Sequence, residues 1–430
     1  MTDFFRAPEP LGTYTVGRDP LTFAAGMSAG GLIFLNGLMP GWSTLGSRSL
    51  LAAPQATAEA ASLWEQAATL LHAAESGVDR ILRADQFFTD WQSVPFFHQV
   101  RKQHCTVSAP STSLLVPGLA LPGASMCMDL IAATRDAGDI EALFPEKLDI
   151  PATSGFAPVM RLGKWVFVAG FMAAHGAGDL NGIAPAAKVP DGHLWKGNRI
   201  QLETDYLLQH KLVPALAAAG LDLRHVRKAT IGLSDLNDLP AMNQVWIKAF
   251  GGQPPATTVI PTSSPGFAIA DARIEINLIA HEDTAIVGTP PQAGQAGAYG
   301  PAYPAVTRVG DFLAFSGAVA VQDDGVAVGS EAPRQFGHRG SAIEDQTAWL
   351  IGQFIQLCKA HKADLNNVVR ISQLHTDLRD LALSCRAWQR ALPDIALPIS
   401  GMQVPRLPAD GAAVQTEIWV YAPEHSQNAQ

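Results

Sequence analysis

The stretch GPAYPAVTRVGDFLAFSG, residues Gly300 to Gly317, opens a unit that closes with ALPISGMQVPRLPADGAAVQTEIWVYA at Ala422. Between these ends, apolar residues recur at helical spacing from about Ile343 to Ala360, and the run VVRISQLHTD has the pattern of a strand. A short helix and a final strand follow. The same order of elements recurs twice upstream in diverged form, which predicts three tandem copies of one α+β unit.

The spacing of marker residues supports the repeat. An aromatic residue stands fourteen residues before a glycine in each copy, at Phe23 and Gly37, Phe156 and Gly170, and Tyr303 and Gly317. An aspartate stands eleven residues before a large side chain, at Asp90 and Arg101, Asp235 and Trp246, and Asp377 and Trp388. A proline stands two residues before a hydroxyl residue, at Pro110 and Thr112, Pro255 and Thr257, and Pro398 and Ser400. Three registers held together favour true repeats over unrelated α/β units of similar length.

The copies predict three domains, 1–136 with a polar N-terminal lead, 153–282 and 298–424. The segments RDAGDIEALFPEKLDIPAT and HEDTAIVGTPPQAGQAGAYG mix small, charged and proline residues, so we expect them to be linkers.

Composition narrows the function classes. The chain has 430 residues, of which 47% are hydrophobic and 16% charged, and a net charge of −9. This is a compact globular composition without the basic footprint of a nucleic-acid-binding protein. No signal peptide and no run of 18 apolar residues is seen, and the four cysteines form no CxxC pair. We therefore expect a cytoplasmic protein that binds neither nucleic acid nor membrane.

These motifs resemble the Rid/YjgF family (L-PSP endoribonuclease-like, enamine/imine deaminase). GPAYPAVTRVGDFLAFSG is similar to the family's GPYSQAV…GDLVFVSGQ opening, VVRISQLHTD to its VVKTTVFVTD-like strand, and ARIEINLIA to its closing VEIEAIA strand. Such proteins have chorismate-mutase-like α+β units that assemble as homotrimers, with a ligand cleft at each subunit interface. The resemblance implies an intramolecular pseudo-trimer, which would exist in solution as a monomer or a dimer of chains.

The resemblance also implies the positions that line each cleft. The aromatic floor and its glycine correspond to Phe23 and Gly37, Phe156 and Gly170, and Tyr303 and Gly317. An asparagine of the short helix corresponds to Asn243 and is replaced by His98 and Cys385. The arginine that clamps a substrate carboxylate corresponds to Thr112, Thr257 and Ser400, and the acid of the last strand to Asp129, Asn277 and Trp419.

Without a matched arginine, none of the three clefts is expected to deaminate 2-imino acids in the family's usual way, because a hydroxyl cannot form the bidentate pair. Arg334 and Arg339, on the long loop of the third copy, are alternative anion-binding candidates. The loop of the second copy holds His175, Asp179, Asp191 and His193 together with Trp195 and Lys196, but its histidines lack tight metal-ligand spacing. No metal or cofactor is expected.

The first copy alone keeps a carboxylate at the acidic position, so we predict that Asp129, His98 and Thr112 carry catalysis in one cleft, with Asp129 as a general base. The predicted function is a hydrolase or deaminase-type enzyme that acts on a C–N or enol/enamine bond of a small molecule. Two alternatives remain open: a noncatalytic protein that binds small metabolites, or a three-repeat enzyme resembling chorismate hydrolases or cyclic-amide hydrolases. The last would need a Ser-Lys pair in each repeat, and no such pair recurs.

Overall fold

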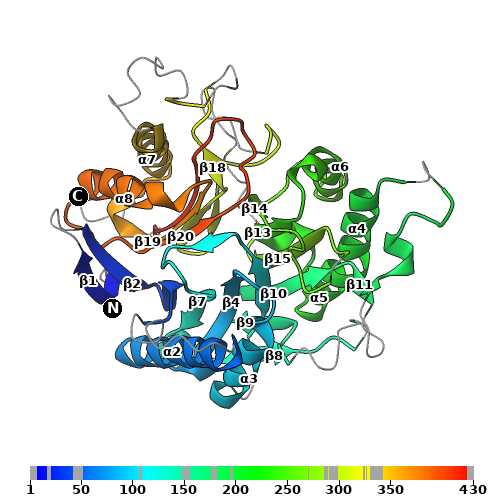
Figure 1. Cartoon of the computed structure of the whole chain (residues 1–430), viewed down its shortest axis with the longest axis horizontal. Helices are drawn as coiled ribbons and strands as arrows, with labels where there is room; N and C mark the ends of the chain where they lie inside the picture. Colours follow the sequence, from blue (N-terminus) through cyan, green and yellow to red (C-terminus); the bar gives the residue numbers. More distant parts are fainter. Residues whose placement is uncertain are drawn as a thin grey trace.

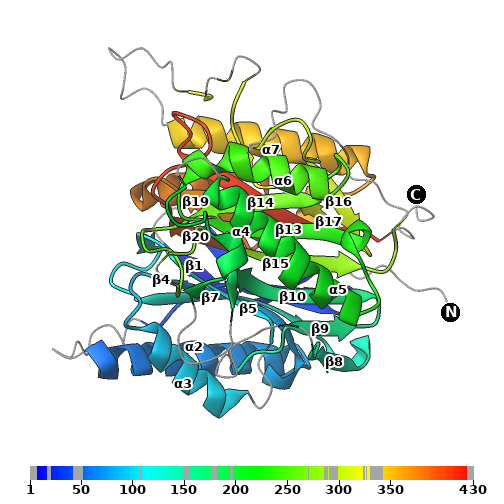
Figure 2. The ribbon, with the colours of Figure 1, turned by 90° about the vertical axis from the view of Figure 1, so that its right-hand side faces the viewer.

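The computed structural model describes residues 7–16, 21–41, 52–105, 109–146, 148, 155–175, 182–193, 197–269, 271–284, 289, 299–322, 325, 327–329 and 342–423, with only the backbone of 52–54. Three large mixed sheets are arranged around a common centre, and each carries helices on its outer side (Figure 1). Seen from the side in Figure 2, α2 and α3 lie at the opposite end of the molecule from α7, with the strands in between. The α+β fold with three repeats is thus confirmed.

The first sheet has the strand order β1-β2-β3-β7-β4-β5. Its strands are β1 (Glu9–Val16), β2 (Leu21–Ala29), β3 (Leu32–Leu38), β4 (Ile81–Phe88), β5 (Ser111–Leu115) and β7 (Met126–Ala133). Its helices are α2 (Ala52–Ala73) and α3 (Val94–His104). Leu63, Ala67 and Leu71 recur at helical spacing and are fully buried, so one face of α2 covers the sheet.

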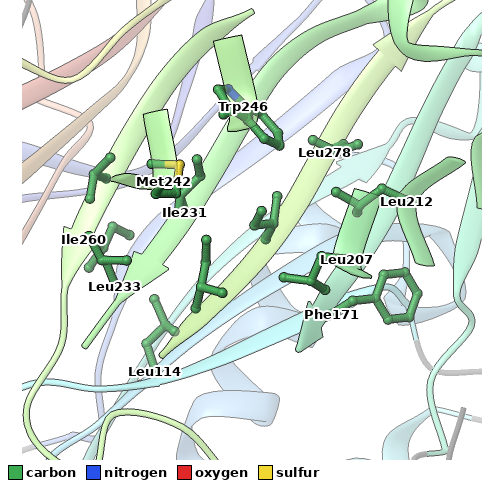
Figure 3. Packing of buried hydrophobic residues seen from close by; sticks show 14 of the residues in the cluster. Leu114, Phe171, Leu207, Leu212, Ile231, Leu233, Met242, Trp246, Ile260 and Leu278 are labelled. Carbon is green, nitrogen blue, oxygen red and sulfur yellow. The ribbon is translucent and has the colours of Figure 1, made fainter. Parts of the chain in front are cut away.

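The second sheet has the order β14-β13-β15-β10-β9-β8. Its strands are β8 (Ile140–Leu143), β9 (Val159–Leu162), β10 (Trp165–Met172), β13 (Val226–Leu233), β14 (Ala256–Pro261) and β15 (Ile274–His281). Its helices are α4 (Arg199–Leu207), α5 (Val213–Ala218) and α6 (Leu239–Ala249), with a π turn, Leu208–Leu212, between α4 and α5. Figure 3 shows Leu207 and Leu212 packed with Met242 and Trp246 over strand residues such as Ile231.

The third sheet has the order β16-β17-β21-β19-β20-β6, and β18 pairs with β21. Its strands are β16 (Val306–Val309), β17 (Phe312–Phe315), β18 (Ala318–Val319), β19 (Val368–His375), β20 (Ile399–Gln403) and β21 (Val414–Tyr421). The remaining strand, β6 (Gly118–Leu119), comes from the first repeat. The helices are α7 (Ala342–Ala360) and α8 (Leu381–Ala391).

Three strands differ from the sequence expectation. The expected polar lead contains β1, which pairs along its length with β2. The first expected linker contains β8, which pairs with β9 and extends the second sheet. The two-residue strand β6 crosses to the third repeat. All three add strands at sheet edges, where backbone hydrogen bonds can form without a strong apolar pattern in the sequence.

An apolar cluster drawn from all three repeats joins the sheets. Phe34 packs against Phe312 and Trp419 with ring centroids 5.5 and 5.8 Å apart, and Trp165 lies 5.9 Å from Phe312. Phe34 belongs to the first sheet, Trp165 to the second, and Phe312 and Trp419 to the third. Each sheet therefore buries its inner face against the other two, which closes the chain into the expected pseudo-trimer. Among the described helices, none is long and apolar enough to cross a membrane.

Candidate functional site

Charged side chains meet at the centre of the three sheets. Arg83, Lys228 and Arg370 occupy the third positions of β4, β13 and β19, and each pairs with the corresponding residue of the neighbouring last strand. All three are at most 7% exposed and line a central cavity of about 20 Å³. That volume is enough for one water molecule and too small for a metabolite.

Buried ion pairs of Arg370 with the first repeat and of Lys228 with the third repeat connect the sheets through this centre. Arg370 of the third repeat lies 2.7 Å from Asp129 Oδ2 of the first repeat. Lys228 of the second repeat lies 2.9 Å from Glu417 Oε2 of the third. The remaining basic residue, Arg83, pairs within its own strand with Asp85 at 3.0 Å.

The boundary between the first and second repeats has hydrogen bonds in place of an ion pair among the described residues, and one of them runs from Arg83 to Thr230 Oγ1 at 3.2 Å. Asn277 Nδ2 of the second repeat donates to Thr112 Oγ1 of the first at 2.6 Å. The equivalent hydroxyls elsewhere are Ser400, which donates to Asp129 at 3.2 Å, and Thr258, which donates to Glu417. The same hydroxyl position thus faces the same last-strand position at all three boundaries, and these contacts close the ring.

The electrostatics of these pairs indicate a structural role. Burial by itself would raise the pKa of Glu417, but Lys228 and Arg370 lower it to about 2. Burial lowers the pKa of Lys228 to about 8 despite Glu417. Burial also raises the pKa of Asp129, although Arg370 opposes the shift, and the nearby carboxylates raise the pKa of Arg370.

Strand register corrects two of the sequence assignments. Asp85, Thr230 and Ser372 stand opposite Asp129, Asn277 and Glu417, respectively, so the third copy matches at Glu417 and not at Trp419. The prediction that only the first copy keeps a carboxylate was therefore wrong. Parallel pairing likewise places Thr258 opposite Thr230, as Thr112 stands opposite Asp85, which displaces Thr257 by one residue.

The three residues predicted to be catalytic do not share one cleft. Asp129 accepts hydrogen bonds from the Gly37 N–H at 2.6 Å, from Arg370 and from Ser400, all at the boundary with the third repeat. Thr112 faces the second repeat and is two strands away, because Asp85 stands between them in the sheet. Asp129 is only 1% exposed, so its carboxyl is shut off from solvent.

His98 lies on α3, at the helix position that Asn243 holds on α6. Burial, with Arg101 and Lys102 nearby, lowers its pKa to about 4. Its Nε2 has no hydrogen-bond partner among the described residues. His98 is therefore a neutral imidazole at neutral pH.

The cleft between the second and third repeats is filled by the protein itself. Tyr303 Oη donates to Asn243 Oδ1 at 2.6 Å, and Asn243 Nδ2 donates to the Tyr299 carbonyl at 3.1 Å. Thr257 bonds its own chain through the Pro255 carbonyl, and its carbonyl accepts from the Gly317 N–H. Tyr299 and Tyr303 are 5% and 1% exposed, so no space remains for a substrate between them.

The cleft between the third and first repeats is closed by backbone. Ala24 N–H donates to the Leu397 carbonyl at 3.0 Å, and Leu397 N–H donates to the Thr22 carbonyl at 2.8 Å, on either side of Phe23. Gly37 has a φ of +63° and packs so closely that a Cβ built on it would lie 3.2 Å from Ser400 Cβ. Strand pairing and close packing thus occupy this boundary.

At the boundary between the first and second repeats, a carboxyl and a hydroxyl converge on Gly170. A Cβ built on Gly170 would clash with Glu275 Oε1 and lie 2.6 Å from Thr112 Oγ1. Glu275 also accepts a hydrogen bond from the Ser113 backbone N–H, and it forms no ion pair in the part of the chain that the structure describes. Burial raises the pKa of Glu275 to about 8, and Asp85 adds to the shift.

The aromatic residue and the glycine of this cleft are less buried than their equivalents in the cleft between the second and third repeats. His98, Phe156 and Gly170 are half-buried, whereas Tyr303 and Gly317 of the second cleft are buried. Glu275 was not among the residues predicted from the sequence, although, like Asp129, it is an acidic residue in an apolar last strand, IEINLIAH. Glu275 corresponds to the first glutamate of the VEIEAIA pattern, which was available from the sequence.

Several other candidates do not join this site. Arg334 and Arg339, like Asp179, Trp195 and Lys196, lie outside the described residues. Among the residues that are described, no group of three histidine, cysteine or acidic side chains could hold a metal ion. A hollow of about 650 Å³ beside Arg227, Phe250 and Pro304 has no carboxylate, histidine or cysteine in its described lining.

Comparison with known proteins agrees with the repeat fold. The family model described as Endoribonuclease L-PSP matches residues 147–282. A RutC family protein of Pyrococcus abyssi is 29% identical over 143 residues, which is 33% of this chain and 98% of the relative. Protein DfrA of Myxococcus xanthus is 37% identical over 73 residues, 17% of this chain and 53% of that protein.

Solved structures resemble the chain at low identity. Yeast Mmf1 covers 34% of this chain and 100% of its own, at 19% identity and a TM-score of 0.27. A chorismatase covers 80% of this chain and 94% of its own, at 14% identity and a TM-score of 0.47. Residues 147–282 thus form a domain of the Rid/YjgF (L-PSP) family, and the chain is built from three repeats with that fold.

Proposed function

We propose that the protein is a small-molecule hydrolase that acts on a C–N or enol/enamine bond in the cleft between the first and second repeats. One observation carries the proposal: the pKa of the Glu275 carboxyl is raised to about 8 at a position shared with Thr112 and Gly170. A carboxyl that is mostly protonated at neutral pH can donate a proton and then take one back, as general acid–base catalysis requires.

Glu275 alone can donate and take back the protons that the reaction requires. For an enamine, the Glu275 carboxylic acid would protonate the β-carbon, which leaves an iminium and a carboxylate. The carboxylate would then accept a proton from water as the water oxygen bonds to the iminium carbon. Proton transfer to nitrogen and cleavage of the C–N bond release an amine and a carbonyl compound.

The surroundings of Glu275 favour an uncharged substrate. Thr112 occupies the position of the family's arginine clamp, and Asp85 lies close enough to raise the pKa of Glu275 further. A substrate carboxylate would find no arginine at the clamp position, and the nearest described cation, Arg83, is already paired with Asp85. Phe156 at the half-buried rim offers an apolar contact to the body of a small substrate.

The test is turnover of uncharged enamines, imines and cyclic amides by the wild-type protein and by Glu275→Gln. We expect the variant to lose about 10²-fold or more in kcat while it stays folded. The matched control is Glu203→Gln, because Glu203 is also buried in the second repeat but accepts the Arg273 N–H and an Arg199 hydrogen bond away from the cleft.

A second measurement does not need a substrate. Carbon-detected titration of the glutamate carboxyls should find one signal with a midpoint near 8 that Glu275→Gln removes. A Glu275 midpoint near the ordinary value of 4.5 would contradict the proposal. Equal turnover by Glu275→Gln and the wild type would move the reaction to another group.

A further inference from the structure

The cleft between the second and third repeats, called the second cleft here, holds the phenol ring of Tyr299 as a binding site holds a ligand. Tyr299 is 5% exposed, and its Oη accepts the Val259 N–H at 2.9 Å. The Gln415 side chain also hydrogen-bonds this oxygen, while its Nε2 donates to the Val259 carbonyl at 3.0 Å. Val259 belongs to the second repeat and Gln415 to the third, so both sides of the boundary recognise the hydroxyl.

The other end of Tyr299 is held as firmly. Its carbonyl accepts from Asn243 Nδ2 at 3.1 Å, and Asn243 is itself fixed by the Tyr303 hydroxyl. The two tyrosine rings meet edge to face with centroids 5.7 Å apart. Such an arrangement is a favourable aromatic contact beyond simple burial.

Gly317 makes room for the hydroxyl. A Cβ built on Gly317 would lie 2.5 Å from Tyr299 Oη and 2.9 Å from Gln415 Nε2. Gly170 is the equivalent glycine in the cleft between the first and second repeats, called the first cleft here. A Cβ built on Gly170 would instead meet Glu275 and Thr112. The Tyr299 hydroxyl therefore lies where the candidate catalytic groups of the first cleft stand.

An apolar cavity of about 40 Å³ adjoins the ring. Its lining includes Tyr299 and Tyr303 together with Phe315, Trp349 and Phe354. Gln353 also lines it, and its Oε1 is buried without a hydrogen-bond partner among the described residues. The pocket around the phenol is thus apolar at its walls and polar at defined points, which is the usual form of a small-molecule site.

We infer that the second cleft is a recognition site for an uncharged hydroxyaryl group, and that the chain's own Tyr299 fills it as a built-in occupant that clasps the second repeat to the third. The Val259 N–H and the Gln415 amide recognise the hydroxyl, and Gly317 leaves space for it. The cleft is consequently closed to outside metabolites. This inference does not depend on the reaction proposed for the first cleft.

The experiment empties the site and refills it. Tyr299→Gly should unfold at a lower temperature than the wild type, and p-cresol should raise its Tm by about 2 °C or more. Toluene, which has the ring but no hydroxyl, should raise it less, because the Val259 N–H would stay unsatisfied. Neither compound should raise the Tm of the wild type or of Tyr14→Gly, since Tyr14 is 54% exposed.

Equal effects of p-cresol and toluene, or none, on folded Tyr299→Gly would overturn the inference. A milder variant covers the case in which Tyr299→Gly does not fold. Tyr299→Phe removes only the hydroxyl, so hydrogen exchange of the Val259 amide in β14 should become at least several-fold faster while exchange in β4 is unchanged. Unchanged exchange at Val259 would also refute the inference.

Discussion

Glu275 and Glu417 are two buried glutamates on the last strands of neighbouring repeats. Their environments shift their pKa values in opposite directions. Both lie in strands whose residues are all buried. Burial raises the pKa of Glu275 to about 8, since no cation offsets it, whereas Lys228 and Arg370 hold the pKa of Glu417 at about 2. Burial is common to both, and the presence of a charged partner decides the protonation state.

This difference in pKa distinguishes two roles of a buried carboxyl in one fold: one joins repeats as part of an ion pair, and the other stays protonated at a cleft. Glu417 and Lys228 belong to the central contacts that join repeats, together with Asp129 and Arg370. Glu275 stands at a cleft where the boundary has no ion pair among the described residues and is bridged by the Asn277–Thr112 and Arg83–Thr230 hydrogen bonds. A fused chain can treat its three boundaries differently, which a symmetric homotrimer cannot do.

The largest expected effect comes from breaking the Glu417 pair. Lys228→Met should cost about 3–5 kcal/mol of unfolding free energy, because Glu417 would remain buried with its main partner gone. Urea denaturation measures the loss. Lys248→Met, at an exposed position of α6, should change stability by less than about 0.5 kcal/mol. A cost for Lys228→Met as small as that of the control would show that the pair does not join the repeats.

Asp129→Asn should act on stability more than on chemistry. The change leaves Arg370 with Asp85 at 3.8 Å as its closest remaining carboxylate in the first repeat, so we expect a loss of about 2–4 kcal/mol. Turnover per folded molecule should change little. The role of general base predicted from the sequence would imply the reverse, a loss of about 10²-fold in turnover with the fold intact. Parallel urea and activity measurements decide between the two.

The pH dependence of stability should carry the signature of Glu275. Its pKa is higher in the folded state, about 8, than the ordinary value of 4.5 expected in the unfolded chain. Its contribution is therefore fully present below about pH 4.5 and is lost as pH rises through 8, by a few kcal/mol at most. The difference in urea midpoint between the wild type and Glu275→Gln should change between pH 5 and pH 9. A constant difference would contradict the shift.

The smallest loss of stability should come from changes at Thr112 and Thr258, which hold equivalent positions in the first and second repeats. Thr112→Val removes a hydrogen bond to the neutral Asn277 amide and should cost about 1 kcal/mol. Thr258→Val removes contacts with Lys228 and Glu417, both charged, and should cost about 1.5–3 kcal/mol. Thermal unfolding of the two variants compares them directly, and a larger loss for Thr112→Val would reverse the ranking of the boundaries.

Much of the fold was predictable because it depends on local patterns. Apolar residues at helical spacing predicted a helix from about Ile343 to Ala360, and α7 spans Ala342–Ala360. The register of paired strands was harder to predict from the sequence. Counting two residues from Pro255 selected Thr257, but the parallel pairing of β13 with β14 places Thr258 at the equivalent position. Hydrogen bonds between strands set the register, and a distance along the chain does not record them.

The candidate site was less accessible to the same reasoning. Glu275 and Asp129 look alike in sequence, each an acid in an apolar strand. Their difference comes from residues of other repeats: Arg370 reaches Asp129 from 241 positions away, and no described cation reaches Glu275. Tyr299 lies near the end of an expected linker, HEDTAIVGTPPQAGQAGAYG, and gave no sign that it would fill a cleft.

By itself the sequence determined the three α+β repeats and their apolar faces, because helix and strand periodicity and turn residues act over a few positions. Only the tertiary structure decided which boundary is filled by Tyr299, which is closed by backbone at Phe23, and which keeps a protonated Glu275. Each of these outcomes depends on side chains that meet across repeats, where distance, burial and charge are properties of the assembled fold.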